Sequence, residues 1–376
     1  MPITVTKLVS FGCDFSDSGN FHAASGGALS APYAGVKSDG PVWTSYLSQL
    51  LGLGDHTASL SGGTAYGWVT AGVTTRYSTI SKSVQEQVDS YLATNTVDSN
   101  TLCTIEGGIN EISNFINATG DGRSITFAAE NIVSLAAQLI NAGAGAVVIL
   151  SMFDIGHNPR YDLNTEGAVR LTAQMYNNTL LNTFNQHNQH SPGVAIMDAF
   201  SWTTTQLNNF SRQGGNTTDA KFPGNLGSGD SYFYFDDMSL STAANALFAA
   251  QVKTFIVNNG LVALPDTTAP VITLNGGWEV THEKGTMYTD AGATSDGGET
   301  VTTTGTVDTN TIGTYTLTYT ATDAAGNAGT ATRTVNVRDM TAPVITLTGG
   351  DATVTHALGT MYTDAGATSD GGETVT

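Results

Sequence analysis

Positively charged side chains are scarce in this sequence of 376 residues, which holds 13 Lys and Arg against 32 Asp and Glu. The formal net charge is therefore −19. Nucleic acids and anionic membrane surfaces both attract basic proteins, so we expect this acidic chain to bind neither of them. The acidic surplus is densest after residue 265, in a part that is rich in Gly and Thr. Such a composition is typical of an extracellular or salt-exposed module.

Cysteines and long apolar runs are also scarce. Two cysteines, Cys13 and Cys103, are too few for a disulfide scaffold, and we expect buried free thiols because both belong to predicted strands of one sheet or to the turn directly after one. No run is long and apolar enough to predict a membrane span. The first seven residues lack the basic start and apolar core of a signal peptide. We therefore expect a chain that is cytosolic, already processed, or exported by a route that reads no N-terminal signal.

Strand and helix signals alternate over residues 1–265. The predicted strands are short and apolar, at 7–11, 101–105, 146–150 and 194–197. The predicted helices are longer, at 44–53, 78–93, 124–141, 166–186 and 241–257. Because parallel strands need helical crossovers, this alternation predicts an α/β fold with a doubly wound parallel sheet and helices on both faces.

The composition changes near residue 265, where helix signals stop. The segment at 268–274 recurs at 341–347, a period of 73 residues, and residues 315–321 alternate apolar and polar side chains as a half-buried strand does. A repeat of this size made of short strands predicts all-β, immunoglobulin-like (Ig-like) sandwiches, and its motifs resemble bacterial Ig-like repeats. We therefore divide the chain into 1–265, an Ig-like repeat at 266–339, and an incomplete second repeat at 340–376. Either the natural chain is longer, or a strand of another copy completes this repeat.

Residues 11–20 follow the first predicted strand and read Phe-Gly-Cys-Asp-Phe-Ser-Asp-Ser-Gly-Asn. This segment resembles the first block of the GDSL (SGNH) ester-hydrolase family, Phe-Gly-Asp-Ser-Leu-Ser-Asp-x-Gly-Asn. The resemblance implies a flavodoxin-like three-layer α/β/α fold. Two positions differ: Cys13 stands where the family has Asp, and Asp14 stands where it has the nucleophilic Ser. The positions that match are Gly12, Ser16, Asp17, Gly19 and Asn20.

Three further blocks carry the resemblance. Asn110 follows the strand at 101–105 and matches the Asn that stabilises the oxyanion. Thr70 stands where the oxyanion-hole Gly belongs, and Gly72 replaces that Gly only if the loop shifts. Asp236 matches the Asp of the catalytic triad, whereas Ser239 stands at the position of its His. Nucleophile and base are thus both replaced.

The replaced residues lead to the hypothesis of a pseudoenzyme, because losing either nucleophile or base costs such a hydrolase about 10⁶ in turnover. Asp14 beside Asn110 is expected to fill the oxyanion hole with a permanent negative charge. Two alternatives stay open. One is an active GDSL-type esterase or lipase with a relocated catalytic set, such as Ser16 with His22. The other is a carbohydrate- or lipid-binding module that reuses the old cleft, with Gly72 and Ser16 as candidate ligand-binding residues.

The Ig-like repeats indicate the cellular location and the role of such a protein. We expect an extracellular or cell-surface protein with a structural, adhesive or assembly role, which associates with itself or with cell-surface polysaccharides. No cofactor is expected in the hydrolase-like domain. Acidic loops such as 295–299 leave calcium as a candidate ligand of the Ig-like repeats, although their spacing is not that of a dedicated calcium loop.

Overall fold

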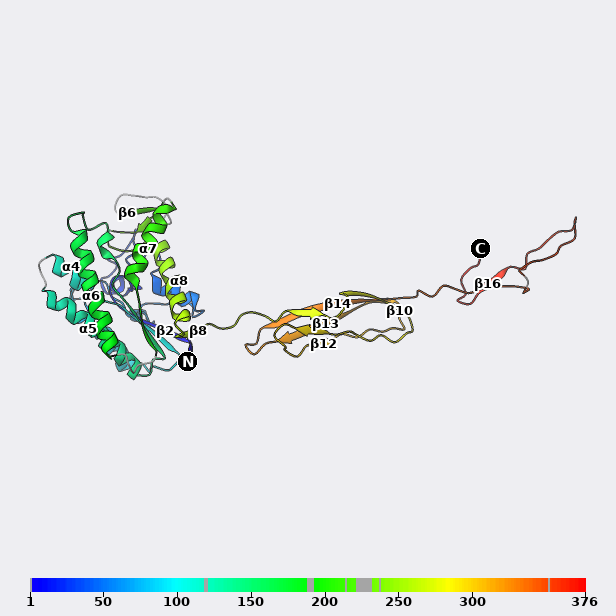
Figure 1. Cartoon of the computed structure of the whole chain (residues 1–376), viewed down its shortest axis with the longest axis horizontal. Coiled ribbons are helices and arrows are strands. Elements are labelled where there is room, and N and C mark those ends of the chain that lie inside the picture. Colours follow the sequence, from blue (N-terminus) through cyan, green and yellow to red (C-terminus); the bar gives the residue numbers. More distant parts are fainter. Residues whose placement is uncertain are drawn as a thin grey trace. The chain divides into compact units, whose positions relative to one another are not determined.

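The computed structural model describes residues 2–117, 121–187, 193–213, 215–220, 232–236, 238–350 and 352–376. The chain forms two compact units, Met1–Leu264 and Pro265–Thr376 (Figure 1). In the described part, no helix combines the length and the apolar character needed to cross a membrane.

A four-stranded parallel sheet forms the centre of the first unit. Its order is β2 (Lys7–Phe11), β3 (Thr101–Ile105), β4 (Ala146–Leu150) and β5 (Val194–Met197). All residues of β3 and β4 are buried, which explains why these strands read as continuous apolar runs rather than alternating ones. A single parallel bridge between Ser10 and Ala65 continues the sheet beyond β2.

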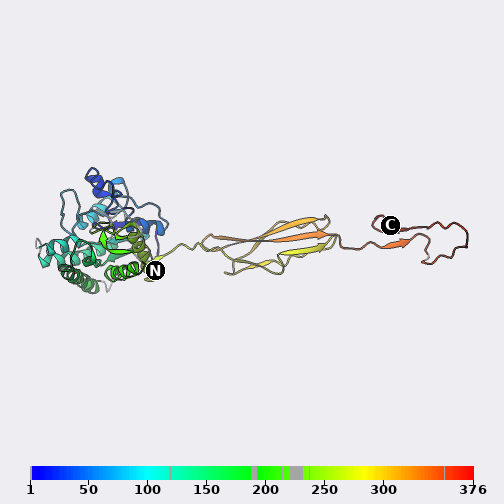
Figure 2. The ribbon, with the colours of Figure 1, turned by 90° about the horizontal axis from the view of Figure 1, so that it is seen from above.

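Helices cover the sheet on both faces, as Figures 1 and 2 show. Helix α5 packs against α6 and against β4, whereas α2 packs against α8. The predicted three-layer α/β/α arrangement is therefore confirmed. The helices are α1 (Asn20–Ala24), α2 (Trp43–Leu50), α3 (Val84–Thr94), α4 (Ile109–Ile116), α5 (Gly122–Asn141), α6 (Glu166–His187), α7 (Ala199–Arg212) and α8 (Thr242–Asn258).

Short elements complete this unit. Two 3₁₀ turns cover Ser59–Ser61 and Ile155–His157. Strand β1 (Ile3–Thr4) pairs with β8 (Val262–Ala263), and β6 (Asn216–Ala220) pairs with β7 (Tyr232–Tyr234).

One helix prediction was wrong at its start. The helix expected at 78–93 begins at Val84, because Ser83 caps it: the Ser83 side chain accepts from the Glu86 N–H, and the Glu86 carboxylate accepts from the Ser83 N–H. This reciprocal pair is a capping box, and it fixes the boundary. Helices α4 and α7 were not predicted at all.

The first repeat of the second unit contains two small sheets. One has the order β10 (Glu279–Glu283), β14 (Ala328–Arg338), β13 (Gly313–Thr322) and β12 (Thr302–Thr304), and the other pairs β9 (Ile272–Leu274) with β11 (Ala293–Ser295). Leu317, Tyr319 and Val335 form the buried centre, against which Ile272 and Leu274 pack. The alternation predicted for residues 315–321 is thus that of β13.

A buried arginine joins the two sheets of this repeat. Arg333 is 1% exposed, and its guanidinium donates to the carbonyl oxygens of Asn275 and Gly277 and pairs with the carboxylate of Asp290. The Tyr319 hydroxyl donates to the same carboxylate at 2.8 Å. A buried guanidinium needs such partners, since an unpaired buried charge is strongly destabilising.

The second repeat shows one pair of strands in its described residues, β15 (Ile345–Leu347) with β16 (Ala367–Ser369). This pair corresponds to β9 with β11 of the first repeat. Ile345 is 50% exposed and Leu347 is 47% exposed, whereas their counterparts in β9 pack against the buried centre.

Candidate active site

The candidate site lies where parallel strands end. Asp14 follows β2, and Glu106 and Asn110 follow β3, so the side chains gather at the carboxyl edge of the sheet. A tight turn after β2, closed by the Ser16 N–H donating to the Cys13 carbonyl at 3.0 Å, places Asp14 at this edge with 8% of its surface exposed.

One oxygen of Asp14 accepts two hydrogen bonds. The Thr70 N–H donates to Asp14 Oδ2 at 3.1 Å, and Asn110 Nδ2 donates to the same oxygen at 3.0 Å. Thr70 has φ of 63°, a left-handed conformation that favours Gly, and it is the one non-glycine residue with positive φ among the described residues. The Thr70 backbone therefore keeps the geometry of a glycine position and directs its N–H at the carboxylate.

Gly72 does not take part in this arrangement. Its N–H donates to the Thr75 carbonyl at 2.9 Å, so that N–H is already used within the loop. A Cβ at this position would lie 2.6 Å from both the Glu111 carboxylate and the Tyr77 ring, and close packing explains the glycine.

A lysine that the sequence analysis missed completes the site. Lys37 Nζ lies 3.6 Å from Asp14 Oδ1 and 3.9 Å from Asp236 Oδ2. It comes from the irregular segment between α1 and α2, where no periodicity signals its position. Lys37 thus lies between Asp14, at the nucleophile position, and Asp236, at the Asp position of the triad. In a working triad, the imidazole of the catalytic His connects these two positions.

Asp236 is held firmly in the last turn before α8. Its Oδ1 accepts from the N–H groups of Met238 at 2.9 Å and Ser239 at 2.5 Å, and its Oδ2 accepts from the Tyr33 hydroxyl at 3.1 Å. Ser239 is 3% exposed, and its hydroxyl is buried without a hydrogen-bond partner among the described residues. A serine hydroxyl does not accept a proton near neutral pH, so Ser239 supplies no base.

Cys13 is a buried thiol, as predicted. Its N–H donates to Glu106 Oε1 at 2.8 Å and its thiol donates to Glu106 Oε2 at 2.9 Å. Burial, together with the neighbouring Glu106 and Asp14 carboxyls, raises the pKa of Cys13 well above its usual value. Burial also raises the pKa of Glu106. A thiol in such surroundings stays protonated, and it is a poor nucleophile.

Two further carboxyls lie in the loops around the site. Asp17 is fully buried and accepts four backbone N–H groups, while burial raises its pKa to about 6. Glu111 accepts from the Val73 N–H at 2.6 Å, its second oxygen is buried without a partner among the described residues, and burial raises its pKa to about 7. Asp17 and Glu111 therefore order these loops rather than act on a ligand.

The described residues contain one buried serine–histidine pair, but it has no access to the site. Ser10 Oγ lies 2.7 Å from His56 Nε2, and the other ring nitrogen lies 3.2 Å from the Thr64 hydroxyl. Ser10 is within β2, fully buried, and burial lowers the pKa of His56 to about 4. Both ring nitrogens of His56 face hydroxyl groups, and no described carboxylate contacts them, so the pair is a structural contact within the fold.

The relocated pair considered from the sequence is not formed. Ser16 is fully buried, and no hydrogen bond joins it to His22 in the part of the chain that the structure describes. Within the same residues, no group of three or more His, Cys, Asp and Glu side chains is arranged to hold a metal ion. Calcium binding by the Ig-like repeats stays a prediction.

Comparison with known proteins places both parts of the chain. Residues 9–252 match the sequence profile described as GDSL-like Lipase/Acylhydrolase, and residues 272–337 match that of Bacterial surface protein, Ig-like domain. A thermolabile hemolysin of Vibrio parahaemolyticus is 28% identical over 174 residues, which cover 44% of this chain and 38% of the hemolysin. This chain therefore spans less than two thirds of that relative.

Solved structures of low identity are also similar to this chain. An acetylxylan esterase from Geobacillus stearothermophilus, crystallised as a catalytic mutant, is 13% identical with a TM-score of 0.43 and covers 70% of this chain and 99% of its own. A member of the lipolytic protein G-D-S-L family from Veillonella parvula is 12% identical with a TM-score of 0.40. The match covers 67% of this chain and 98% of the Veillonella chain. Since the first profile alone matches well over half of its residues, the chain belongs to the GDSL-like lipase/acylhydrolase family and continues into a bacterial surface Ig-like domain.

Proposed function

We propose that this chain is a surface protein whose hydrolase-like domain does not hydrolyse esters, and whose Ig-like repeats serve a structural or adhesive role. One observation carries the proposal: the Asp14 carboxylate accepts the hydrogen bonds of Thr70 N–H and Asn110 Nδ2. These are the two groups that the family resemblance assigns to the oxyanion hole.

A carboxylate in this place opposes ester hydrolysis in two ways. Acyl transfer passes through an anionic tetrahedral intermediate, which donors around the oxyanion stabilise. Here those donors already bind a negative charge, so a second anion would be repelled. Asp14 also lacks the hydroxyl that would attack the ester, and the nearest cation, Lys37, is positioned between two carboxylates.

The direct test is hydrolysis of p-nitrophenyl acetate by the purified chain. We expect a rate no higher than that of the same protein after heat denaturation, and no further loss in Asp14→Ala. The matched variant restores the family residues with Cys13→Asp, Asp14→Ser and Ser239→His, combined with Lys37→Ala to make room for the imidazole. An ordinary esterase rate in the unmodified chain that disappears in Asp14→Ala would refute the proposal.

The surface role rests on the match of residues 272–337 to a bacterial surface Ig-like domain. Its test is labelling of intact cells with an antibody against the first repeat, together with electron microscopy of the purified chain. Labelling of intact cells, or fibres and sheets on the grid, would support the role. Labelling only after lysis, with isolated particles on the grid, would contradict it.

A further inference from the structure

A polar cleft of about 520 Å³ lies in the hydrolase-like unit, outside the Asp14–Lys37–Asp236 arrangement. It is bounded by the segment after β4 (156–163), the first turn of α6, one face of α7 and the beginning of β6. None of the three charged residues of the candidate active site lines it. Its volume falls within the range of about 300–1,000 Å³ that is usual for small-ligand sites.

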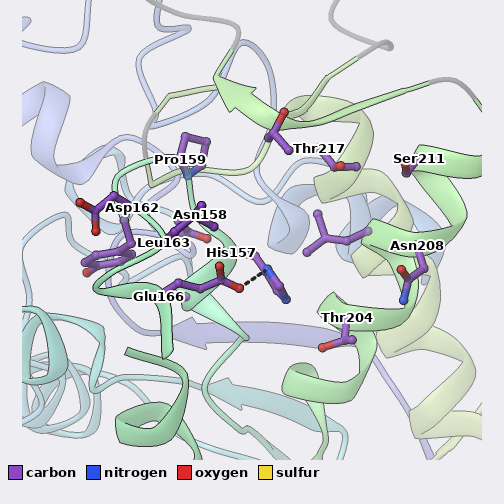
Figure 3. A pocket seen from close by; sticks show the side chains of 14 residues that line it. His157, Asn158, Pro159, Asp162, Leu163, Glu166, Thr204, Asn208, Ser211 and Thr217 are labelled. Carbon is purple, nitrogen blue, oxygen red and sulfur yellow. Dashed lines mark ion pairs between the residues drawn. The ribbon is translucent and has the colours of Figure 1, made fainter. Parts of the chain in front are cut away.

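Polar side chains on one face of α7 form a wall of this cleft. Thr204, Asn208 and Ser211 follow one another at helical spacing, and Figure 3 shows them along one side, with Thr217 of β6 nearby. Asn208, Ser211 and Thr217 make no side-chain hydrogen bond to any other residue that the structure describes. Their amide and hydroxyl groups are therefore available to a ligand.

The opposite side of the cleft carries two acidic side chains, one of which contacts a histidine. His157 Nδ1 lies 3.1 Å from Glu166 Oε1, the contact drawn in Figure 3, and Asp162 also lines the cleft. The Glu166 side chain is 27% exposed and the His157 side chain is 31% exposed. The other ring nitrogen of His157, Nε2, lies 3.5 Å from Asp154 Oδ2, so this side of the cleft offers carboxylate acceptors to a ligand.

The charges of the lining decide which ligand class fits. Among the residues that the structure describes, no Lys or Arg lines the cleft, and the nearby Arg170 is bound to the buried Asp154 carboxylate at 3.0 Å. Phosphates, sulfates and carboxylates would therefore meet acidic groups without a compensating cation. Polar side chains also outnumber apolar ones in the described lining, so it lacks the predominantly apolar surface that an acyl chain requires.

We propose that this cleft binds a segment of a neutral carbohydrate. Sugar hydroxyls donate and accept at once, which matches a lining that presents amide and hydroxyl groups on α7 and carboxylate acceptors near α6. The site is independent of Asp14, so it would operate whether or not the domain hydrolyses esters. It gives the chain a recognition function beyond its degenerate catalytic centre.

Calorimetric titration of the full chain tests this proposal, with neutral xylo-, cello-, malto- and chito-oligosaccharides as probes. We expect one family of oligosaccharides to bind, and Asn208→Ala to weaken that binding about 3- to 10-fold through loss of its hydrogen bonds. Asn209→Ala is the matched control, because Asn209 is also exposed on α7 but does not line the cleft. The Asn209→Ala variant should bind the oligosaccharide with the affinity of the parent chain. Both variants should melt at the temperature of the parent chain.

Three results would overturn the proposal. The first is that no probe binds at concentrations on the order of 10 mM. The second is that a probe binds but Asn208→Ala and Asn209→Ala bind it equally well. The third is that polygalacturonate or a short-chain phosphatidylcholine binds in the Asn208-dependent way while neutral sugars do not.

Discussion

The buried carboxyl of Glu111 predicts that stability falls as the pH rises. Burial raises its pKa from about 4.5 to about 7, which means that the fold favours the protonated form. Its contribution to stability is therefore fully present below pH 4.5 and is lost as the pH rises through 7. A difference of about 2.5 pH units corresponds to about 3 kcal/mol of unfolding free energy between pH 4.5 and pH 8.

Replacing Glu111 with Gln isolates this effect. The amide oxygen still accepts from the Val73 N–H, but the side chain no longer ionises. Asp17 and Glu106, whose pKa values are also raised, remain in both proteins and contribute equally. The difference in unfolding free energy between Glu111→Gln and the parent should therefore grow by about 3 kcal/mol from pH 4.5 to pH 8.

Urea unfolding at several pH values measures this difference. The fluorescence reports mainly on the hydrolase-like unit, because three of the four tryptophans, Trp43, Trp68 and Trp202, are buried there, whereas Trp278 is 70% exposed. If the curves of unfolding free energy against pH run parallel in the two proteins, the pKa of Glu111 is the same in the folded and the unfolded chain. That result would refute the reasoning.

Further predictions concern packing, the Ig-like core and the thiols. Gly67→Ala should lower the unfolding free energy by about 2 kcal/mol, because its Cβ would collide with the Ser16 backbone, whereas Gly167→Ala in α6 meets open space and should raise it by about 0.5 kcal/mol. Asp290→Ala leaves the buried Arg333 without its carboxylate, and calorimetry should show the Ig-like repeat destabilised by about 3 kcal/mol; an unchanged melting temperature would contradict this. Neither cysteine should react with a thiol reagent in the native chain, and both should react in guanidinium; rapid native labelling would contradict their burial.

The sequence contained enough to predict the sheet and part of the site. Strands buried on both faces are continuous apolar runs, so β3 and β4 are visible without any structure. Asn110 and Asp236 could be placed because each stands in a recognisable block, one after a strand and one before the last helix. The start of α3 could also have been found, since Ser83 and Glu86 have the spacing of a capping box.

Other parts depend on tertiary contacts that no local pattern encodes. Lys37 lies in an irregular segment, and its place between Asp14 and Asp236 results from how that segment packs over the carboxyl edge of the sheet. The left-handed conformation of Thr70 contradicts the ordinary preference of a β-branched residue. The cleft beside α7 is equally hidden, because its walls come from segments far apart in the chain.

The bridge formed by Lys37 has an evolutionary consequence. Lys37 connects the turn after β2 to the turn before α8 through two ion pairs, and this connection is the tie between the two turns. A mutation at any of these positions therefore also changes the stability of the fold. If the domain is inactive, as proposed above, a mutation of Asp14 to Ser would weaken that tie and gain no turnover until an imidazole also appeared. On that proposal, descendants of this chain would have to pass through less stable and equally inactive forms before they gained esterase chemistry, and the loss would tend to become permanent.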